Sequence, residues 1–302
     1  MQPAAKVRHK NRRAAATMQR MAANASEYAT AESIPRFREA NQPDLLSIAA
    51  IAIAATVIAN FIHEGLGHGG VCVATGGQAL AISTVHFECS AETRLVAAGG
   101  TLANLIFGAL FWAAARAVKR TAPWRYFFWL LMTFNLFPAG GYFLFSGIGN
   151  IGDWASVVAE WQPAWAWRVG LVVLGTVTYF FLFVPLCVRE LRPFLGIDSQ
   201  MRVRRARRLT LVPYLAGGIL NCVAGALNPV SPRSILISAA AASFGGLSGL
   251  TWIWTLLHGE RIPSSGLQIP EVERSPGWVI AAVVLAIVFI AGLGPGVKFH
   301  LA

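Results

Sequence analysis

Seven long apolar runs restrict what this chain can fold into. They cover approximately residues 44–63, 95–118, 124–148, 167–188, 209–226, 234–257 and 277–297. Most of them approach or exceed the roughly 20 residues that an α-helix needs to cross a bilayer. The chain is 55% hydrophobic and only 13% charged, whereas about a quarter of the residues in an average soluble domain are charged. We therefore expect an all-α polytopic membrane protein with about seven transmembrane helices.

The fifth run leaves a second count open. It is short, and Gly217 and Gly218 interrupt it, so it can also be interpreted as a re-entrant segment. In that case the protein has six spans.

The basic residues predict the orientation. Residues 1–43 carry eight Lys or Arg against three acids, and further Lys and Arg gather in alternate connections between the runs. Because cytoplasmic loops are enriched in Lys and Arg, the N-terminus should be cytoplasmic and the C-terminus outside. We expect residues 1–43 to be a mostly disordered tail that touches anionic lipid. No nucleic-acid-binding motif accompanies the charge, so we expect no nucleic-acid partner. The expected location is the inner (plasma) membrane of a bacterium.

The first run ends in a polar stretch, His63-Glu64-Gly65-Leu66-Gly67-His68. Ionisable groups are costly in a membrane segment, so they mark a functional site by default. The stretch is one residue longer than H-E-x-x-H, in which two histidines one turn apart hold zinc and the glutamate acts as general base.

The longer spacing has three interpretations. Residues i and i+5 of an ideal α-helix point about 140° apart, but a π-bulge would bring His63 and His68 onto one face. Alternatively the helix ends near Gly65 and His68 returns from the following loop. In the third arrangement Glu64 and His68 are the ligands, which removes the obvious base.

A third metal ligand is expected from the glycine-rich segment that ends in Asp153. This is the only acid between Glu92 and Glu160, and Gly147, Gly149 and Gly152 loosen the chain before it. His86 and Glu88 are the alternative third ligands. They lie in the loop of residues 69–93, for which we expect a short hairpin or re-entrant element.

Two cysteines flank that loop. On the predicted topology Cys72 and Cys89 face an oxidising compartment, where a disulfide forms readily. The other interpretation is two unpaired small residues.

Three elements in this order resemble the site-2 protease family of intramembrane zinc metalloproteases. They are the His-Glu…His stretch, Ala98-Gly99-Gly100-Thr101-Leu102-Ala103-Asn104, similar to the family's A-G-P-x-x-N, and Asn135-Leu136-Phe137-Pro138, similar to the start of its N-x-x-P-x-x-x-x-D-G. The resemblance covers about residues 50–155. The chain departs from the family at three places: Gly67 stands at the second histidine, Gly100 at the proline and Phe143 at the aspartate ligand.

The residues and the resemblance together predict three regions: the tail 1–43, a membrane core 44–155 with the metal site, and additional helices 156–302. Zinc is the expected cofactor, with His63, His68 and Asp153 as ligands and Glu64 as the base. Substrate binding or support is expected from Gly99, Gly100, Asn104, Asn135 and Pro138.

The expected function is that of a membrane-embedded zinc metalloprotease that cuts a peptide bond in or near the membrane. Its partners would be membrane lipids and a membrane-protein or peptide substrate. The alternatives are a metal-dependent hydrolase of a non-peptide membrane substrate on the same scaffold, and an inactive relative that binds membrane proteins.

Overall fold

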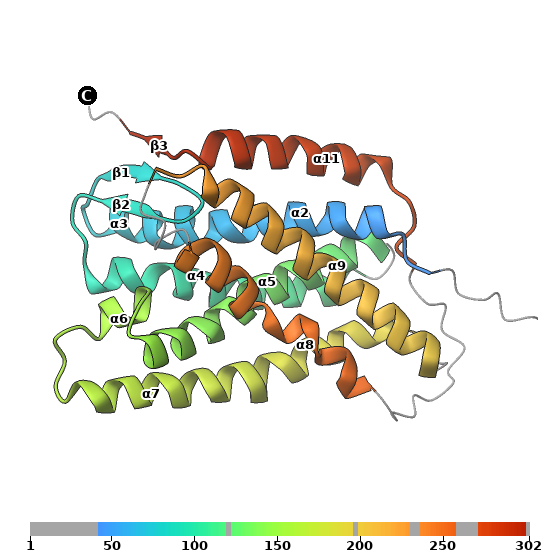
Figure 1. Ribbon diagram of the computed structural model, residues 1–302, viewed down its shortest axis with the longest axis horizontal. Helices are drawn as coiled ribbons and strands as arrows, with labels where there is room; N and C mark the ends of the chain where they lie inside the picture. The colour runs from blue at the N-terminus through green and yellow to red at the C-terminus, as the bar shows by residue number, and fades with distance from the viewer. Residues whose placement is uncertain (1–41, 119–121, 196–198, 230–235, 258–270, 300–302) are drawn as a thin grey trace, which may run out of the picture. The chain divides into compact units, whose positions relative to one another are not determined.

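A computed structural model describes residues 42–118, 122–195, 199–229, 236–257 and 271–299. The basic tail predicted for residues 1–43 lies outside these residues except at its last two positions. Figure 1 shows how the helices and strands of the described residues are arranged.

The described part of the chain is mostly helical. Its helical elements are α2 (Leu45–Phe61), η1 (Ile62–Gly69), α3 (Gly70–Ala74), α4 (Arg94–Ala117), α5 (Ala122–Gly149), α6 (Asp153–Val157), α7 (Ala164–Thr176), η2 (Val177–Phe183), α8 (Val184–Leu191), η3 (Arg192–Phe194), α9 (Ser199–Ala226), η4 (Leu236–Gly245), η5 (Ser248–Thr251), η6 (Ile253–Leu257), α11 (Pro276–Ile287) and η7 (Val288–Leu293). The strands are β1 (Ala79–Ile82), β2 (Phe87–Cys89) and β3 (Val297–Lys298).

Six helices in the described part of the chain are long and apolar enough to cross a membrane. They are Leu45–Ala74, Arg94–Ala117, Pro123–Gly149, Ala164–Phe194, Met201–Ala226 and Pro276–Leu293. Each coincides with a predicted span. The protein is therefore an all-α polytopic membrane protein, as expected from its hydropathy.

The predicted span 234–257 takes another form. Its described part consists of the π-helix η4 followed by the 3₁₀-helices η5 and η6, so it is not counted among the six. Gly245 ends η4 and Gly246 follows it in the break before η5, and glycine, which lacks a side chain, weakens a continuous helix. In Figure 1 this segment runs back alongside α9 and returns the chain to the other end of the bundle.

The expectation that Gly217 and Gly218 break the fifth span is wrong. Helix α9 continues through both glycines for 28 residues. A Cβ at Gly217 would lie 2.6 Å from Thr56 Oγ1. The glycine therefore permits close approach of α2 and α9, as small residues do between membrane helices.

Helix α5 supplies much of the apolar core. Tyr126, Trp129 and Leu130 are completely buried, and apolar residues occur all round the helix, as expected of a helix with neighbours on every side. The helix also continues through Pro138 and the following glycines to Gly149.

A small antiparallel sheet lies at one end of the bundle (Figure 1). Strands β1 and β2 form the expected hairpin, and β3 from the end of the chain pairs with the other edge of β1. A disulfide joins Cys72, in α3, to Cys89, in β2. The hairpin is thereby attached to the helix that contains both site histidines.

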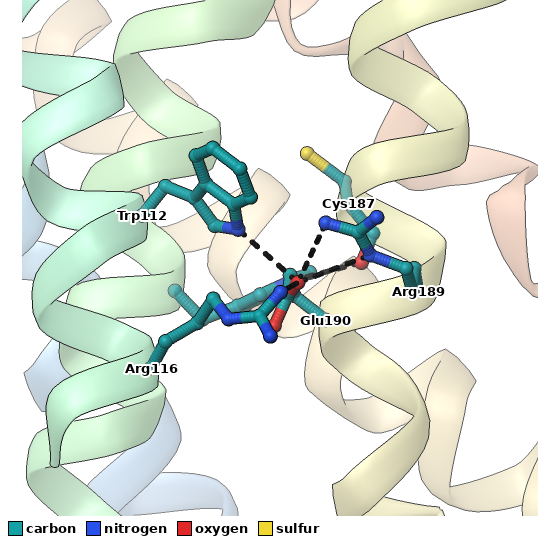
Figure 2. Close-up of polar contacts among 6 residues, drawn as sticks. Trp112, Arg116, Cys187, Arg189 and Glu190 are labelled. Atoms are coloured by element: carbon teal, nitrogen blue, oxygen red, sulfur yellow. Dashed lines mark hydrogen bonds and ion pairs between the residues drawn. The ribbon is translucent and has the colours of Figure 1, made fainter.

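Helices α4 and α8 are joined by a buried carboxylate (Figure 2). Glu190 Oε1 accepts hydrogen bonds from Trp112 Nε1 at 3.1 Å and Arg189 Nη2 at 3.0 Å, and Arg116 Nη1 lies 3.4 Å away. Both arginines are about half exposed, so their charges are partly hydrated. The cluster lies near the C-terminal end of α4, whereas the site residues described next lie in its first half.

Candidate metal centre

The polar stretch after α2 is a π-helix. Element η1 contains both histidines, and one extra residue per turn places residues i and i+5 on the same face. As a result His63 Nε2 and His68 Nε2 are 3.3 Å apart. The structure thus confirms the π-bulge interpretation. A helix end near Gly65 is wrong, because the helical segment continues to Ala74.

Glycines allow this segment to pack directly against α4. A Cβ on Gly67 would lie 2.6 Å from Gly100 Cα, and one on Gly99 would lie 2.5 Å from Gly67 O. Real Cβ atoms do not approach so closely, so the contact between the two backbones requires glycine. Gly67, which stands where the resemblance places a histidine, is therefore a packing residue.

The third potential ligand, Asp153, follows a turn after α5. Asn150 and Gly152 have φ values of 54° and 82°, and this left-handed backbone reverses the chain before Asp153 opens α6. Asp153 Oδ2 lies 3.4 Å from His63 Nε2 and 3.6 Å from His68 Nε2. Phe143 instead packs against Trp154, with their ring centroids 4.7 Å apart.

The spacing of these three atoms is suitable for a metal ion. Zinc binds histidine nitrogen and carboxylate oxygen at about 2.0–2.2 Å, which gives a tetrahedral edge of about 3.3–3.6 Å between ligand atoms. The observed separations are 3.3, 3.4 and 3.6 Å. His63, His68 and Asp153 form a potential metal-binding group, and Glu64 is not part of it, contrary to the third interpretation of the spacing.

The other ring nitrogens leave both Nε2 atoms available. His68 Nδ1 lies 2.7 Å from Val96 O, and a carbonyl accepts only from a protonated nitrogen. His63 Nδ1 lies 3.1 Å from the Asn104 side-chain amide, whose Oδ1 is otherwise without a partner among the described residues. Turning that amide by 180° would let Oδ1 accept from His63 Nδ1, the usual support of a metal-binding histidine.

The charges in the site favour an ionised aspartate. Burial raises the pKa of Asp153, but the contact with His63 and the charges of His63 and His68 lower it by more. The net pKa is below the ordinary value for a carboxyl group. Asp153 is therefore in the form that binds a cation.

A cavity of about 450 Å³ opens beside the three ligand atoms. Glu64 lines it and is 7% exposed. His86, Glu92 and Arg94 line the same cavity together with the end of the hairpin. Glu64, the predicted base, is thus next to both the potential ligands and the cavity.

The other predicted residues divide into two groups. Gly99, Gly100 and Asn104 lie at the site, as described above, and His86 lines the cavity. Asn135 does not reach it: its Nδ2 donates to Leu131 O within α5 at 2.7 Å. Pro138 lines a smaller adjoining cavity, and Glu88 is exposed on β2. Neither belongs to the potential metal-binding group.

The sequence did not indicate two residues of the site. Tyr142 stacks on the His63 ring, with centroids 5.0 Å apart and planes inclined by 13°. Ser238 of η4 lines both cavities. Tyrosines in apolar runs are commonly interfacial anchors, and a lone serine has no distinguishing pattern.

Comparisons with known proteins add no assignment. The chain matches no family model, no curated protein and no solved structure.

Proposed function

We propose that this protein is a membrane-embedded zinc metalloprotease that hydrolyses a peptide bond in or near the bilayer. The π-helix supports this most directly, because it brings His63 and His68 together in the register that a metal requires. Asp153 completes an open three-ligand set, the pattern of catalytic rather than structural zinc. The ordered stretches that resemble motifs of site-2 proteases point to the same chemistry.

Each residue then has a defined task. Zinc held by His63, His68 and Asp153 would supply a Lewis acid that polarises a carbonyl group and makes water more acidic. Glu64 accepts the proton of the attacking water and passes it to the leaving amine. Asn104 and the Val96 carbonyl orient the two histidines through their Nδ1 atoms.

Metal content tests the ligand set. We expect detergent-purified protein to bind about one zinc per chain, as an open three-ligand site predicts. The variants His63→Ala, His68→Ala and Asp153→Ala should lose it. His86→Ala is the matched control. His86 lines the same cavity but does not belong to the potential metal-binding group, so this variant should retain zinc. Zinc retained in Asp153→Ala but lost in His86→Ala would identify His86, and not Asp153, as the third ligand. Wild-type protein that is folded but contains no metal would contradict the proposal.

Hydrolysis tests the base. Glu64→Gln keeps the shape of the side chain but cannot accept a proton, so it should retain zinc and lose cleavage of single-span peptides in detergent. Cleavage at the wild-type rate would remove Glu64 from the mechanism. Turnover of a lipid or small amide with no peptide cleaved would favour the hydrolase of a non-peptide substrate.

A further inference from the structure

A second, smaller cavity lies next to the metal centre. It measures about 70 Å³ and shares four lining residues with the main cavity: His63, Glu64, Tyr142 and Ser238. A group bound at the metal centre therefore has this space beside it. We call it the polar chamber, after its side chains Asn60, Thr84, Asn221 and Ser243.

The chamber is lined by residues with buried hydrogen-bonding atoms that lack a partner. Asn60 Nδ2 donates to Thr84 O at 2.9 Å, and Asn221 Nδ2 donates to Ser243 Oγ at 2.8 Å. Asn60 Oδ1, Asn221 Oδ1 and Thr84 Oγ1 are buried and have no partner among the described residues. Thr84 itself is only 3% exposed.

Buried polar atoms of folded proteins are nearly always hydrogen-bonded. Asn60 Oδ1 and Asn221 Oδ1 can only accept, and the Thr84 hydroxyl can accept as well as donate. Because all three residues line one space, they favour a ligand that donates. None of the described residues lining the chamber is Lys or Arg, so the chain does not supply a charged donor itself.

The size of the chamber limits the ligand. One water occupies about 30 Å³ in the liquid, so 70 Å³ holds a group of about two to three heavy atoms. A hydroxyl or carboxamide side chain is of this size.

We infer that the polar chamber is a specificity pocket for a small hydrogen-bond-donating side chain, that of Ser, Thr or Asn, next to the bond that is cut. The substrate role depends on the proposed protease function. A pocket built to hydrogen-bond O–H or N–H discriminates strongly against an analogue that lacks it, because its own polar groups are then left unpaired.

A binding experiment tests the chamber without hydrolysis. Acetamide imitates an Asn side chain, and acetone has nearly the same shape without the N–H donors. We expect acetamide to raise the unfolding midpoint of the purified full chain more than acetone does. Thr84→Val and Asn221→Leu should abolish the difference.

Thr101→Val is the matched control. Thr101 Oγ1 is also buried without a described partner, but Thr101 does not line the chamber, so this variant should keep the preference for acetamide. Equal shifts with the two probes would mean that the chamber does not select a donor. A preference that survives in Thr84→Val would mean that acetamide binds without using the chamber. Either result would overturn the inference.

Peptides test the substrate role. For matched single-span peptides with Ser or Ala beside the cut bond, kcat/KM should favour Ser by about 10-fold or more. Thr84→Val should remove that ratio and Thr101→Val should keep it. Cleavage of both peptides at the same rate would overturn the inference of a specificity pocket but would still support the proposed protease function. A preference for acetamide over acetone without cleavage of any peptide would support a chamber that binds donors, but it would contradict the proposed protease function.

Discussion

Gly100 lies against the two histidine rings. A Cβ at this position would be 2.5 Å from His63 Cε1 and 2.6 Å from His68 Nε2. Both rings belong to side chains that are buried and held through their Nδ1 atoms, so neither can move away without losing a hydrogen bond. A side chain at residue 100 would therefore displace both rings that carry the potential ligand atoms.

We expect Gly100→Ala to weaken zinc binding by about 10- to 100-fold, the range seen when the surroundings of metal ligands are altered. Competition with a chelator measures the affinity. Gly70→Ala is the control, because no atom lies within 4 Å of the added Cβ. An unchanged affinity in Gly100→Ala would show that the rings are free to shift.

Residue chemistry also explains what the sequence could predict of the site. His63, Glu64, His68 and Asp153 are recognisable because ionisable groups are scarce in apolar segments. Ser238 and Asn221 are not, because neutral polar residues are common in membrane helices and their direction depends on how the helices pack. Phe143 stands where the resemblance places an aspartate ligand, and the turn at Asn150 and Gly152 explains how Asp153 reaches the histidines instead.

At the scale of the element, α2 begins at a capping aspartate. Asp44 accepts hydrogen bonds from Ser47 N and Ser47 Oγ, both at 2.8 Å. The bond from the Ser47 N–H is the main cause that lowers the pKa of Asp44. Since the carboxylate is favoured in the folded state, its stabilising effect is complete above its ordinary pKa and is lost as the pH falls.

We expect Asp44→Ala to destabilise the protein by about 1 kcal/mol near neutral pH, the usual value for a helix cap. The difference from wild type should narrow below about pH 4, where the wild-type carboxylate becomes protonated. Unfolding midpoints across this range measure the effect. Asp44→Asn retains the cap without the charge, so its stability should depend less on pH; a constant gap for Asp44→Ala would contradict the argument.

The hairpin depends on a covalent link. Cys72 and Cys89 are 17 residues apart, and closing a loop of this length stabilises a protein by about 3 kcal/mol in the chain-entropy model. Replacing both cysteines by alanine should therefore lower the unfolding midpoint, and a reductant should have no further effect on the variant. Replacing Cys187 and Cys222, which are free, should preserve the response to reductant.

Hydropathy predicted the six long helices because length and apolar character are enough to define a span. It could not show that residues 236–257 form π- and 3₁₀-helices, since these differ from an α-helix in hydrogen bonding and not in composition. For the same reason the sequence allowed a π-bulge at His63 without requiring it.

At the scale of the whole molecule, the predicted orientation places the hairpin outside and the Glu190 cluster in the cytoplasm. Ser90 and Ala117 are exposed and mark these two sides. In a background lacking Cys187 and Cys222, a membrane-impermeant thiol reagent should label Ser90→Cys in intact cells and label Ala117→Cys only after lysis. The reverse pattern would invert the topology and place the disulfide in a reducing compartment.

The π-helix also bears on how such a site can arise and be recognised. An α-helix accommodates a one-residue insertion as a π-turn. An added residue can therefore increase the sequence separation of two histidines while their ring nitrogens stay close enough to bind one metal ion. In this protein the interval is five and the nitrogens are 3.3 Å apart. A sequence pattern that requires the two histidines to be four residues apart does not detect such a site. A pattern that tolerates one inserted residue beside glycines does detect it.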